Sequence, residues 1–176
     1  ESRRNKELVS FIENNMTDGA LKVEKAFLPI FKYSPQSGKA DMPLYVTSSV
    51  ITEVAPLLLL LKSDIDFKTV VIEEPEAHLH PALQRKMARF IVHLMNSGKM
   101  VWITTHSDTI LQHINNMIKL VNHKDKTELM ERFGYDKGDL LSVKKIGMYQ
   151  FSKRGDEKTK VEQLTAGNDG FVVPTF

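Results

Sequence analysis

The sequence predicts an α/β fold in which parallel strands are flanked by helices. Two short runs rich in β-branched residues, KTVVIE (68–73) and KMVWITT (99–105), are typical of buried strands. Between them, residues 82–97 carry apolar side chains at helical spacing, which indicates an amphipathic helix. Ser107 is a candidate N-cap for a further helix that runs to about residue 120. A strand, a helix and a strand of these lengths favour a βαβ unit, whose two strands are parallel.

The ends of the central helix are marked by residues with special backbone preferences. Pro81 suits the first turn of a helix, where its missing N–H costs nothing. Gly98 suits the position just after the helix, because glycine adopts the left-handed conformation without penalty. Both residues therefore support a helix over 82–97.

The residues before this unit predict a helix, a β hairpin and a second helix. Residues 5–16 show apolar side chains at helical spacing. Residues 20–34 and 43–47 are expected to be strands, and the polar stretch SPQSGKAD (34–41) between them is expected to be the loop of an N-terminal β hairpin. Residues 49–62 are mostly apolar, which indicates a largely buried helix.

Secondary structure is less strongly specified in the C-terminal third. Residues 127–142 indicate one or two short helices. Residues 144–152 and 158–164 indicate a second hairpin that turns at the RGDE tetrapeptide. The final stretch, GNDGFVVPTF (167–176), is expected to be an extended tail.

Composition limits the class of protein. The 176 residues are 41% hydrophobic, which suits a single domain, residues 1–176, with a real core. The formal net charge of +2 does not support nucleic acid as a partner, although a local basic patch stays open. There are no cysteines, so disulfides and thiolate metal sites are excluded.

The sequence favours a protein of the cytoplasm with no membrane partner. The longest apolar run, VAPLLLLL (54–61), is too short to span a bilayer, and the first residues show no signal-peptide pattern. The absence of cysteine is compatible with a cytoplasmic location. Because the chain does not begin with Met, we expect a fragment or a processed chain.

Polar residues follow both predicted strands at their carboxyl ends. Glu73 and Glu74 end the first strand, and His106 follows the second. Parallel strands end at the same edge of a sheet, and ligands bind beyond those ends in α/β folds, so the two groups are expected to meet at one rim. Two adjacent acids after a strand suit nucleotide hydrolysis. We assign Glu73 to Mg²⁺ through water, Glu74 to the attacking water and His106 to the γ-phosphate.

Four segments resemble parts of a known class of proteins. VVIEEPEAHLHPALQ (70–84) resembles the Walker B motif and D-loop, and VWITTHSDTIL (101–111) the H-loop, of ABC-type ATPase heads of the RecF, SMC and OLD (overcoming lysogenization defect) class. They look most similar to bacterial AAA family ATPases that share the phrases IEEPEAHLHP and TTHSD. YVTSSVITEVAPLLLLLKS (45–63) resembles the signature motif and its helix, and DGFVVPTF (169–176) resembles the C-termini of this family.

The resemblance implies a function and partners. The chain would supply the signature, Walker B, D-loop and H-loop of an ATP-hydrolysing head, with ATP and Mg²⁺ as cofactors. Ser48 and Ser49 would open the signature helix and contact the nucleotide held by a second head, so that a homodimer is implied for the full-length protein. Relatives of this shape work in DNA repair, chromosome maintenance and anti-phage defence.

The sequence departs from the family pattern in several places. Val50 stands where many signature motifs have glycine, Glu73 stands where most ABC ATPases have aspartate, and His80 stands where the D-loop often ends in aspartate. No Walker A sequence, G-x-x-x-x-G-K-[ST], occurs: SPQSGKAD lacks the upstream glycine and has Ala40 at the Ser/Thr position, and NSGKM fails similarly. The simplest interpretation is a C-terminal lobe whose Walker A lobe lies outside the chain. The chain alone would then be inactive.

The acids and histidines also allow simpler interpretations. Glu73 and Glu74 could end a strand in water, and Glu76 could be only a first-turn acid that suits a helix N-terminus. His78 and His80 form an H-x-H pair of the kind that zinc sites use, but no further ligand is evident in the sequence.

Two other functions stay open. One is a non-catalytic, ATPase-like module that acts through protein contacts. The other is a metal-dependent nuclease that uses the acids after the first strand and the H-x-H pair. A separate acidic pattern also relates to nucleases. Asp64 and Asp66 form a D-x-D pattern similar to that of Toprim nucleases, but here it precedes a strand rather than following one, which is typical of a turn.

Overall fold

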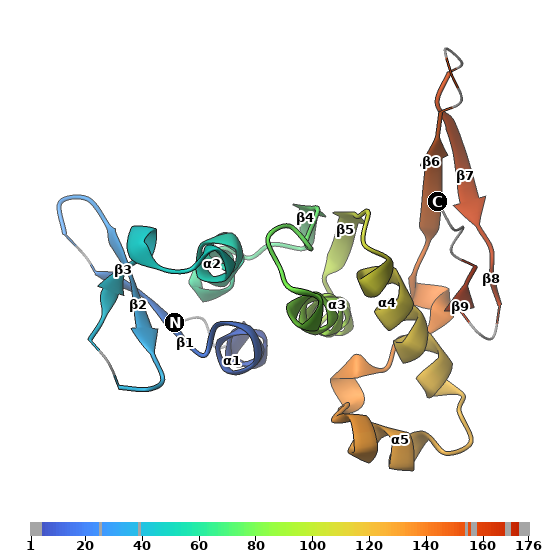
Figure 1. The fold of residues 1–176 in the computed structure, drawn as a ribbon, viewed down its shortest axis with the longest axis horizontal. Helices are drawn as coiled ribbons and strands as arrows, with labels where there is room; N and C mark the ends of the chain where they lie inside the picture. The colour runs from blue at the N-terminus through green and yellow to red at the C-terminus, as the bar shows by residue number, and fades with distance from the viewer. Residues whose placement is uncertain are drawn as a thin grey trace. The chain divides into compact units, whose positions relative to one another are not determined.

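The chain divides into two compact units, residues 1–106 and residues 107–176. The computed structural model describes residues 5–24, 26–38, 40–153, 155, 158–167 and 170–172. Figure 1 shows the helices and strands of both units. The fold combines helices with a parallel strand pair, so the predicted α/β class is confirmed. That the two units act as a single domain stays a prediction.

The first unit contains helices and two small sheets. Its helices are α1 (Lys6–Ile12), α2 (Ser49–Lys62) and α3 (Pro81–Asn96), and a π-helical turn, Glu13–Thr17, continues α1. Its strands are β1 (Gly19–Glu24), β2 (Ile30–Pro35), β3 (Met42–Pro43), β4 (Thr69–Glu73) and β5 (Met100–Thr104). The three predicted helices and the two predicted parallel strands are therefore confirmed. No helix in the described ranges is long and apolar enough to cross a membrane.

Strands β4 and β5 form the predicted parallel pair. Their register runs from Thr69 opposite Met100 to Glu73 opposite Thr104. Helix α3 connects the two strands and packs against β5, as Figure 1 shows. The βαβ unit is therefore confirmed, and both strands end at one edge.

The two faces of this pair lie in different environments. Side chains alternate between the faces of a strand, and here alternate residues are half-buried and exposed. Those facing the core are Val70, Val101 and Ile103. Those on the other face include Val71, Met100 and Trp102, which are exposed by 66%, 60% and 62%. Because parallel sheets are ordinarily covered on both faces, this open apolar face is unusual.

The core of the first unit is formed mainly by α1, α2 and α3. The apolar stripes of these helices meet there, and the rings of Phe11 and Phe90 lie 6.2 Å apart. Each fully buried Leu or Phe contributes about 1.5–3 kcal/mol to stability. The core residues are Leu8, Phe11, Ile12, Met16, Leu21, Val54, Ala55, Leu58, Leu61, Leu79, Met87, Phe90, Ile91 and Leu94.

The ends of α3 lie where the sequence placed them. Pro81 is the first residue of the helix. Gly98 follows the helix with φ +89°, a left-handed conformation that costs glycine nothing. The roles predicted for both residues are confirmed.

The N-terminal sheet differs from the predicted hairpin. Residues 20–34 were expected to be one strand, but they contain two antiparallel strands, with Gly19 opposite Pro35 and Glu24 opposite Ile30. The apolar run hid the reversal, although Pro29 marks it. Residues 43–47 were also expected to be a strand. Pairing stops at Pro43, which has no N–H to donate, and Leu44–Val46 form a 3₁₀ turn.

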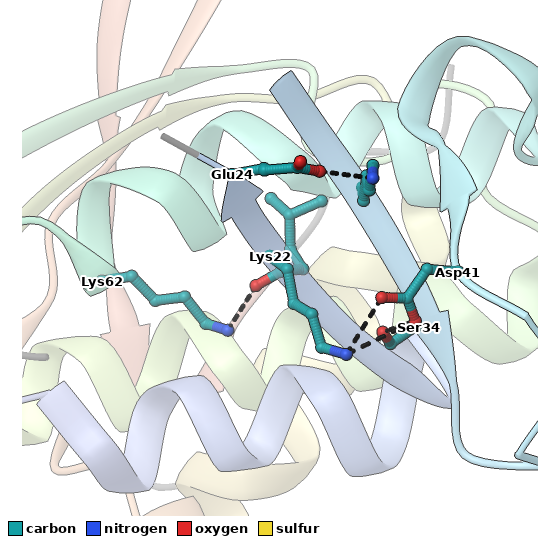
Figure 2. A network of polar contacts seen from close by, with 7 residues as sticks. Lys22, Glu24, Ser34, Asp41 and Lys62 are labelled. Carbon is teal, nitrogen blue, oxygen red and sulfur yellow. Dashed lines mark hydrogen bonds and ion pairs between the residues drawn. The ribbon is translucent and has the colours of Figure 1, made fainter. Parts of the chain in front are cut away.

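Polar side-chain contacts accompany the backbone ladders of this sheet, whose strand order is β1-β2-β3. Figure 2 shows Lys22 on β1 reaching Asp41, with Nζ 3.1 Å from Oδ2, and Ser34 on β2 donating to the same carboxylate. The Ser34 hydroxyl, followed by Lys22, lowers the pKa of Asp41. Glu24 raises the pKa of Lys32, its ion-pair partner across the two strands. These contacts join all three strands near one edge.

Lys62, at the end of α2, ties the sheet to the helices. Its Nζ donates to the carbonyl oxygen of Leu21 on β1 at 2.7 Å, as Figure 2 shows. The same Nζ lies 2.6 Å from a carboxylate oxygen of Glu13. Both side chains of this ion pair are mostly buried, at 16% and 20% exposure, so the contact is protected from water.

The second unit begins with a capped helix. Its helices are α4 (Asp108–Val121) and α5 (Lys126–Phe133), and its strands are β6 (Met148–Ser152), β7 (Lys160–Leu164), β8 (Ala166–Gly167) and β9 (Gly170–Phe171). The Ser107 side chain accepts from the N–H of Ile110 at 3.2 Å, so its predicted cap is confirmed. Helix α5 and the 3₁₀ turn Lys137–Asp139 match the short helices expected over 127–142.

The second hairpin and the tail are confirmed in part. Strands β6 and β7 pair antiparallel from Met148–Leu164 to Ser152–Lys160. Most of the RGDE turn lies outside the described residues, as do residues 168–169 and 173–176 of the tail. The described part of the tail forms the short pair β8–β9 rather than a plain extended segment. The Asn115 side chain on α4 anchors it, with a hydrogen bond of 2.8 Å to each of the Phe171 backbone groups.

Candidate functional site

The carboxyl ends of β4 and β5 form a common rim. Glu73 and Thr104 are the last ladder partners, and both side chains are exposed on the open face of the pair. The Glu74 N–H donates to the carbonyl oxygen of Thr104 at 2.9 Å, so the chain stays bonded to β5 one residue beyond the strand. The predicted meeting of the two strand ends is therefore seen in the backbone.

Glu74 leaves the strand in an uncommon conformation. Its φ is +45°, in the left-handed region that costs a side-chain-bearing residue about 1–2 kcal/mol. Its carbonyl oxygen then accepts from the N–H of Ala77 at 2.8 Å, which closes a tight turn. The turn redirects the chain immediately after the strand, and the Glu74 side chain is exposed at the rim. Strain of this kind is concentrated at functional sites in proteins.

Glu76 joins the two segments that follow the strands. Its Oε2 accepts from the Thr105 hydroxyl at 2.8 Å, and its Oε1 accepts from the backbone N–H of His106 at 2.7 Å. The interpretation of Glu76 as a first-turn acid is wrong, because the first turn of α3 contains no acid. The sequence contained a usable indication: residues 76 and 105–106 follow the paired strands at the same edge.

His80 is the N-cap of α3. Its Nδ1 accepts from the N–H of Ala82 at 3.3 Å, a capping role that Ser, Thr, Asp or Asn usually takes. His78 is exposed with φ +57°. Neither histidine belongs to a group of three close ligand side chains within the described ranges. The structure therefore gives no support to a zinc site at the H-x-H pair.

Ser48 and Ser49 lie at the N-terminus of α2. Ser48 is the N-cap, both serines are exposed, and the Ser48 side chain makes no capping bond. Val50 packs against the core of the unit. In the part of the chain that the structure describes, no hydrogen bond or ion pair joins the serines to Glu73 or Glu74. The structure thus brings Glu73, Glu74 and the His106 backbone together at the rim, but not the serines.

Asp64 and Asp66 lie at the other end of β4. They occupy the connection between α2 and β4, which begins at Thr69, whereas Glu73 ends that strand and Glu74 follows it. Opposite ends of a strand cannot supply ligands to one metal ion. The D-x-D pattern therefore lies in an irregular connection that precedes the strand.

The rim has the chemistry to hold a metal-bound phosphate. The carboxylates of Glu73 and Glu74 are exposed, and no described cation is within ion-pairing distance of either one. Carboxylate oxygens are ligands that Mg²⁺ prefers, and an imidazole N–H is a donor for phosphate oxygen. The donor set therefore fits Mg²⁺, although the backbone loop that would hold the phosphates is not part of the sequence.

The α/β fold is similar to that of an SMC ATPase head. The similar fold is that of a solved chain from work on the structural biochemistry of ATP-driven dimerization and DNA stimulated activation of SMC ATPases. The TM-score is 0.56 at 13% sequence identity, and the match covers 92% of this chain and 83% of that chain. At this identity the likeness concerns the fold alone.

Residues 2–111 match the family described as the AAA ATPase domain, and the chain belongs to this family. No curated protein matches the sequence. Family and fold together support an ATPase-type function that uses a nucleotide, usually with Mg²⁺.

Proposed function

We propose that this chain takes part in ATP hydrolysis as the lobe of an ABC-type ATPase head that carries the signature motif, Walker B motif, D-loop and H-loop. The observation that carries the proposal is the common rim, where Glu73 lies opposite Thr104 and the His106 N–H donates to the carboxylate of Glu76. Ligands of α/β folds bind beyond the carboxyl ends of parallel strands. Membership of the AAA ATPase domain family supports the same function.

Three side chains divide the chemistry at this rim. Glu74 orients and polarises the water that attacks the γ-phosphate, and the tight turn that follows β4 carries its exposed carboxylate. Glu73, the last residue of β4, holds Mg²⁺ through water. His106 donates a hydrogen bond to the γ-phosphate. A bound Mg²⁺ supplies neutralisation of the charge on the phosphate oxygens.

The open face of the parallel pair favours a further layer of structure that covers it in the complete head. Two strands alone make a marginal sheet, and Val71, Met100 and Trp102 are exposed on a face that parallel sheets normally bury. We assign that face, and the free edges of β4 and β5, to the lobe that carries the Walker A loop. The chain alone is then expected to turn over no measurable ATP, because the phosphate cradle is in the other lobe.

Ser48 and Ser49 serve a second head. They lie at the N-terminus of a 14-residue helix, where backbone N–H groups favour an anion. The Val50 side chain packs against the core, which leaves the outer side of the first turn to the two serines. In a homodimer with ATP between the heads, the serines of one head contact the nucleotide of the other head. The Glu73–Glu74 pair acts on the nucleotide of its own head. The solved SMC ATPases of similar fold are described as dimerizing in an ATP-driven way.

The test uses Glu74→Gln in a complete head that includes the Walker A lobe. The amide keeps the size of the side chain but cannot polarise water as a carboxylate does, so turnover should fall by about a hundredfold or more. ATP binding and ATP-dependent dimerisation should stay at the level of the unaltered protein. Glu131→Gln, the same chemical change on the exposed side of α5, is the matched control and should leave turnover unchanged.

The alternatives give different results in the same assays. Full turnover in Glu74→Gln removes Glu74 from the role of base. Absence of nucleotide binding by the complete head favours a non-catalytic interaction module. Cleavage of DNA or RNA with Mg²⁺ or Mn²⁺ but without ATP favours a nuclease. The output of the ATPase, whether DNA repair, chromosome maintenance or defence against phage, depends on parts of the protein beyond this lobe.

A further inference from the structure

Glu76 differs from the other two acids of the strand-end segment in how its carboxylate is used. Both of its oxygens accept hydrogen bonds, one from the Thr105 hydroxyl at 2.8 Å and one from the His106 N–H at 2.7 Å. Bonds to an ionised acceptor are short and strong compared with neutral ones. The bonds cross from the segment after β4 to the segment after β5, over 29 and 30 residues of sequence.

The segment that carries Glu76 is itself firmly held. Pro75 on one side is buried, and Leu79 on the other lies in the core with 6% exposure. The Leu79 N–H donates to the carbonyl oxygen of Glu76 at 3.0 Å, and the Gln84 side chain of α3 donates to the carbonyl oxygen of Leu79 at 2.9 Å. The Glu76 backbone is thus fixed to the core and to α3.

The segment that donates these hydrogen bonds, residues 105–106, lies just beyond the end of the β4–β5 ladder. His106 is the last residue of the first unit, one residue beyond Thr105, and its side chain is exposed. The β4–β5 ladder stops at Thr104. The Glu76 carboxylate therefore fixes the backbone from which the His106 imidazole projects.

We propose that Glu76 is the positioning residue of His106, an inference that rests on the proposed ATPase function. Each Glu76 oxygen already accepts a hydrogen bond from the segment after β5, so we assign its carboxylate to holding that segment. It holds the His106 backbone so that the imidazole stays at the rim beside Glu74. It also links the two strand-end segments mechanically, so that a shift of His106 on loss of the γ-phosphate is transmitted to the turn formed by residues 74–77.

One arm of the test needs no nucleotide. In this chain, the His106 amide should be protected from hydrogen exchange by its bond to Glu76. Glu76→Ala, which removes both acceptor oxygens, should raise the exchange rate of that amide by about tenfold or more, while amides in α3 keep their rates. An unchanged His106 rate would mean that the bond does not form in solution, and the inference would fail whatever the ATPase assays give.

The second arm measures turnover in the complete head. Glu76→Gln and Thr105→Val should lower kcat between about tenfold and a hundredfold, the scale on which a small misplacement of a reacting group acts. The KM for ATP should change little. Thr105→Ser keeps the hydroxyl donor, so its kcat should be close to that of the unaltered protein. If Thr105→Val lost activity only through poor folding, the Ser variant would not be expected to differ from it in this way. Equal thermal stability of the Val and Ser variants completes the control.

Double variants separate this inference from the function on which it rests. In a His106→Ala background, Glu76→Gln should cause no further loss of kcat, because the group that it positions is gone. If His106→Ala lowers kcat but Glu76→Gln multiplies that loss, the positioning role is refuted and the ATPase proposal stands. If His106→Ala leaves kcat unchanged, the proposed role of His106 fails first.

Discussion

The backbone N–H of Glu74 donates to the carbonyl oxygen of Thr104 at 2.9 Å, although Glu74 has already left the strand with φ +45°. The bond holds the acid at the end of β4 against the end of β5. The same residue adopts a left-handed conformation, which costs a glutamate free energy. Backbone strain and a candidate catalytic carboxylate therefore occur at the same residue.

Relief of this strain is a measurable prediction. Glu74→Gly should be more stable than Glu74→Ala by about 1 kcal/mol, because glycine has no Cβ to clash in the left-handed region, a gain partly offset by its larger backbone entropy. Both variants should lose ATP turnover in a complete head. Urea unfolding of the two variants gives the comparison. Equal stability, or a more stable alanine variant, would show that the conformation carries no strain in solution.

Trp102 reports on the open face of the β4–β5 pair. It is the single tryptophan of the sequence and is 62% exposed. In this chain alone, its fluorescence should be quenched readily by acrylamide. In a complete head the Walker A lobe should cover it, which shifts emission to shorter wavelength and lowers the quenching constant several-fold. If quenching is the same in both proteins, another surface holds the lobe.

Lys62 should contribute to stability more than other lysines. Lys62→Met keeps most of the apolar stem but removes the bonds to Glu13 and to the Leu21 carbonyl, which leaves a mostly buried carboxylate unpaired. Loss of hydrogen bonds to charged groups predicts a cost of about 2 kcal/mol. Lys68→Met, at an exposed lysine, is the matched control and should be nearly neutral. Chemical denaturation of both variants measures the difference.

Asp41 predicts how the N-terminal sheet responds to acid. Its pKa is lowered by the Ser34 hydroxyl and by Lys22, so the ionised form stabilises the folded sheet. That contribution is present above the pKa of an unfolded aspartate and is lost as the pH falls through the lower folded pKa, below about pH 4. NMR titration of the carboxyl should show the lowered pKa. Asp41→Asn should abolish the corresponding acid loss of β2–β3 amide protection.

Lys32 gives the opposite dependence at high pH. Glu24 raises its pKa, so its contribution is present below the pKa of an unfolded lysine and is lost as the pH rises through the higher folded pKa, above about pH 10. The loss of stability at low pH and the loss at high pH should therefore affect different strand pairs. Asp41 acts near β3, and Lys32 pairs with Glu24 between β1 and β2.

Local sequence patterns were sufficient to predict a helix or strand where its own residues determine its position and length. The stripe over 82–97, with Pro81 before it and Gly98 after it, specified α3 to within a residue at each end. The β-branched runs specified β4 and β5, and the helix between them required the strands to be parallel. The strand over 20–34 was wrong because an apolar run does not show where a chain reverses, and pairing of β1 with β2 is set by contacts between strands.

The candidate site divides in the same way. The acid pair and His106 were predicted to share a rim because that conclusion needs only the parallel order of two strands. Glu76 was misinterpreted because a carboxylate three residues after a strand can cap a helix, meet solvent or accept from a neighbouring segment. The two hydrogen bonds of Glu76 depend on the direction that the chain takes after the turn at Glu74.

The sequence by itself determined the α/β class, the parallel pair and the kind of side chains at its rim, because periodicity and strand order are local properties. Only the tertiary structure decided that Glu76 binds the segment of His106, that His80 caps α3 and that Trp102 lies on an open face. Those relationships join residues far apart in the chain or depend on the backbone conformation of a turn, and hydrogen bonds form only when both partners are brought within about 3 Å.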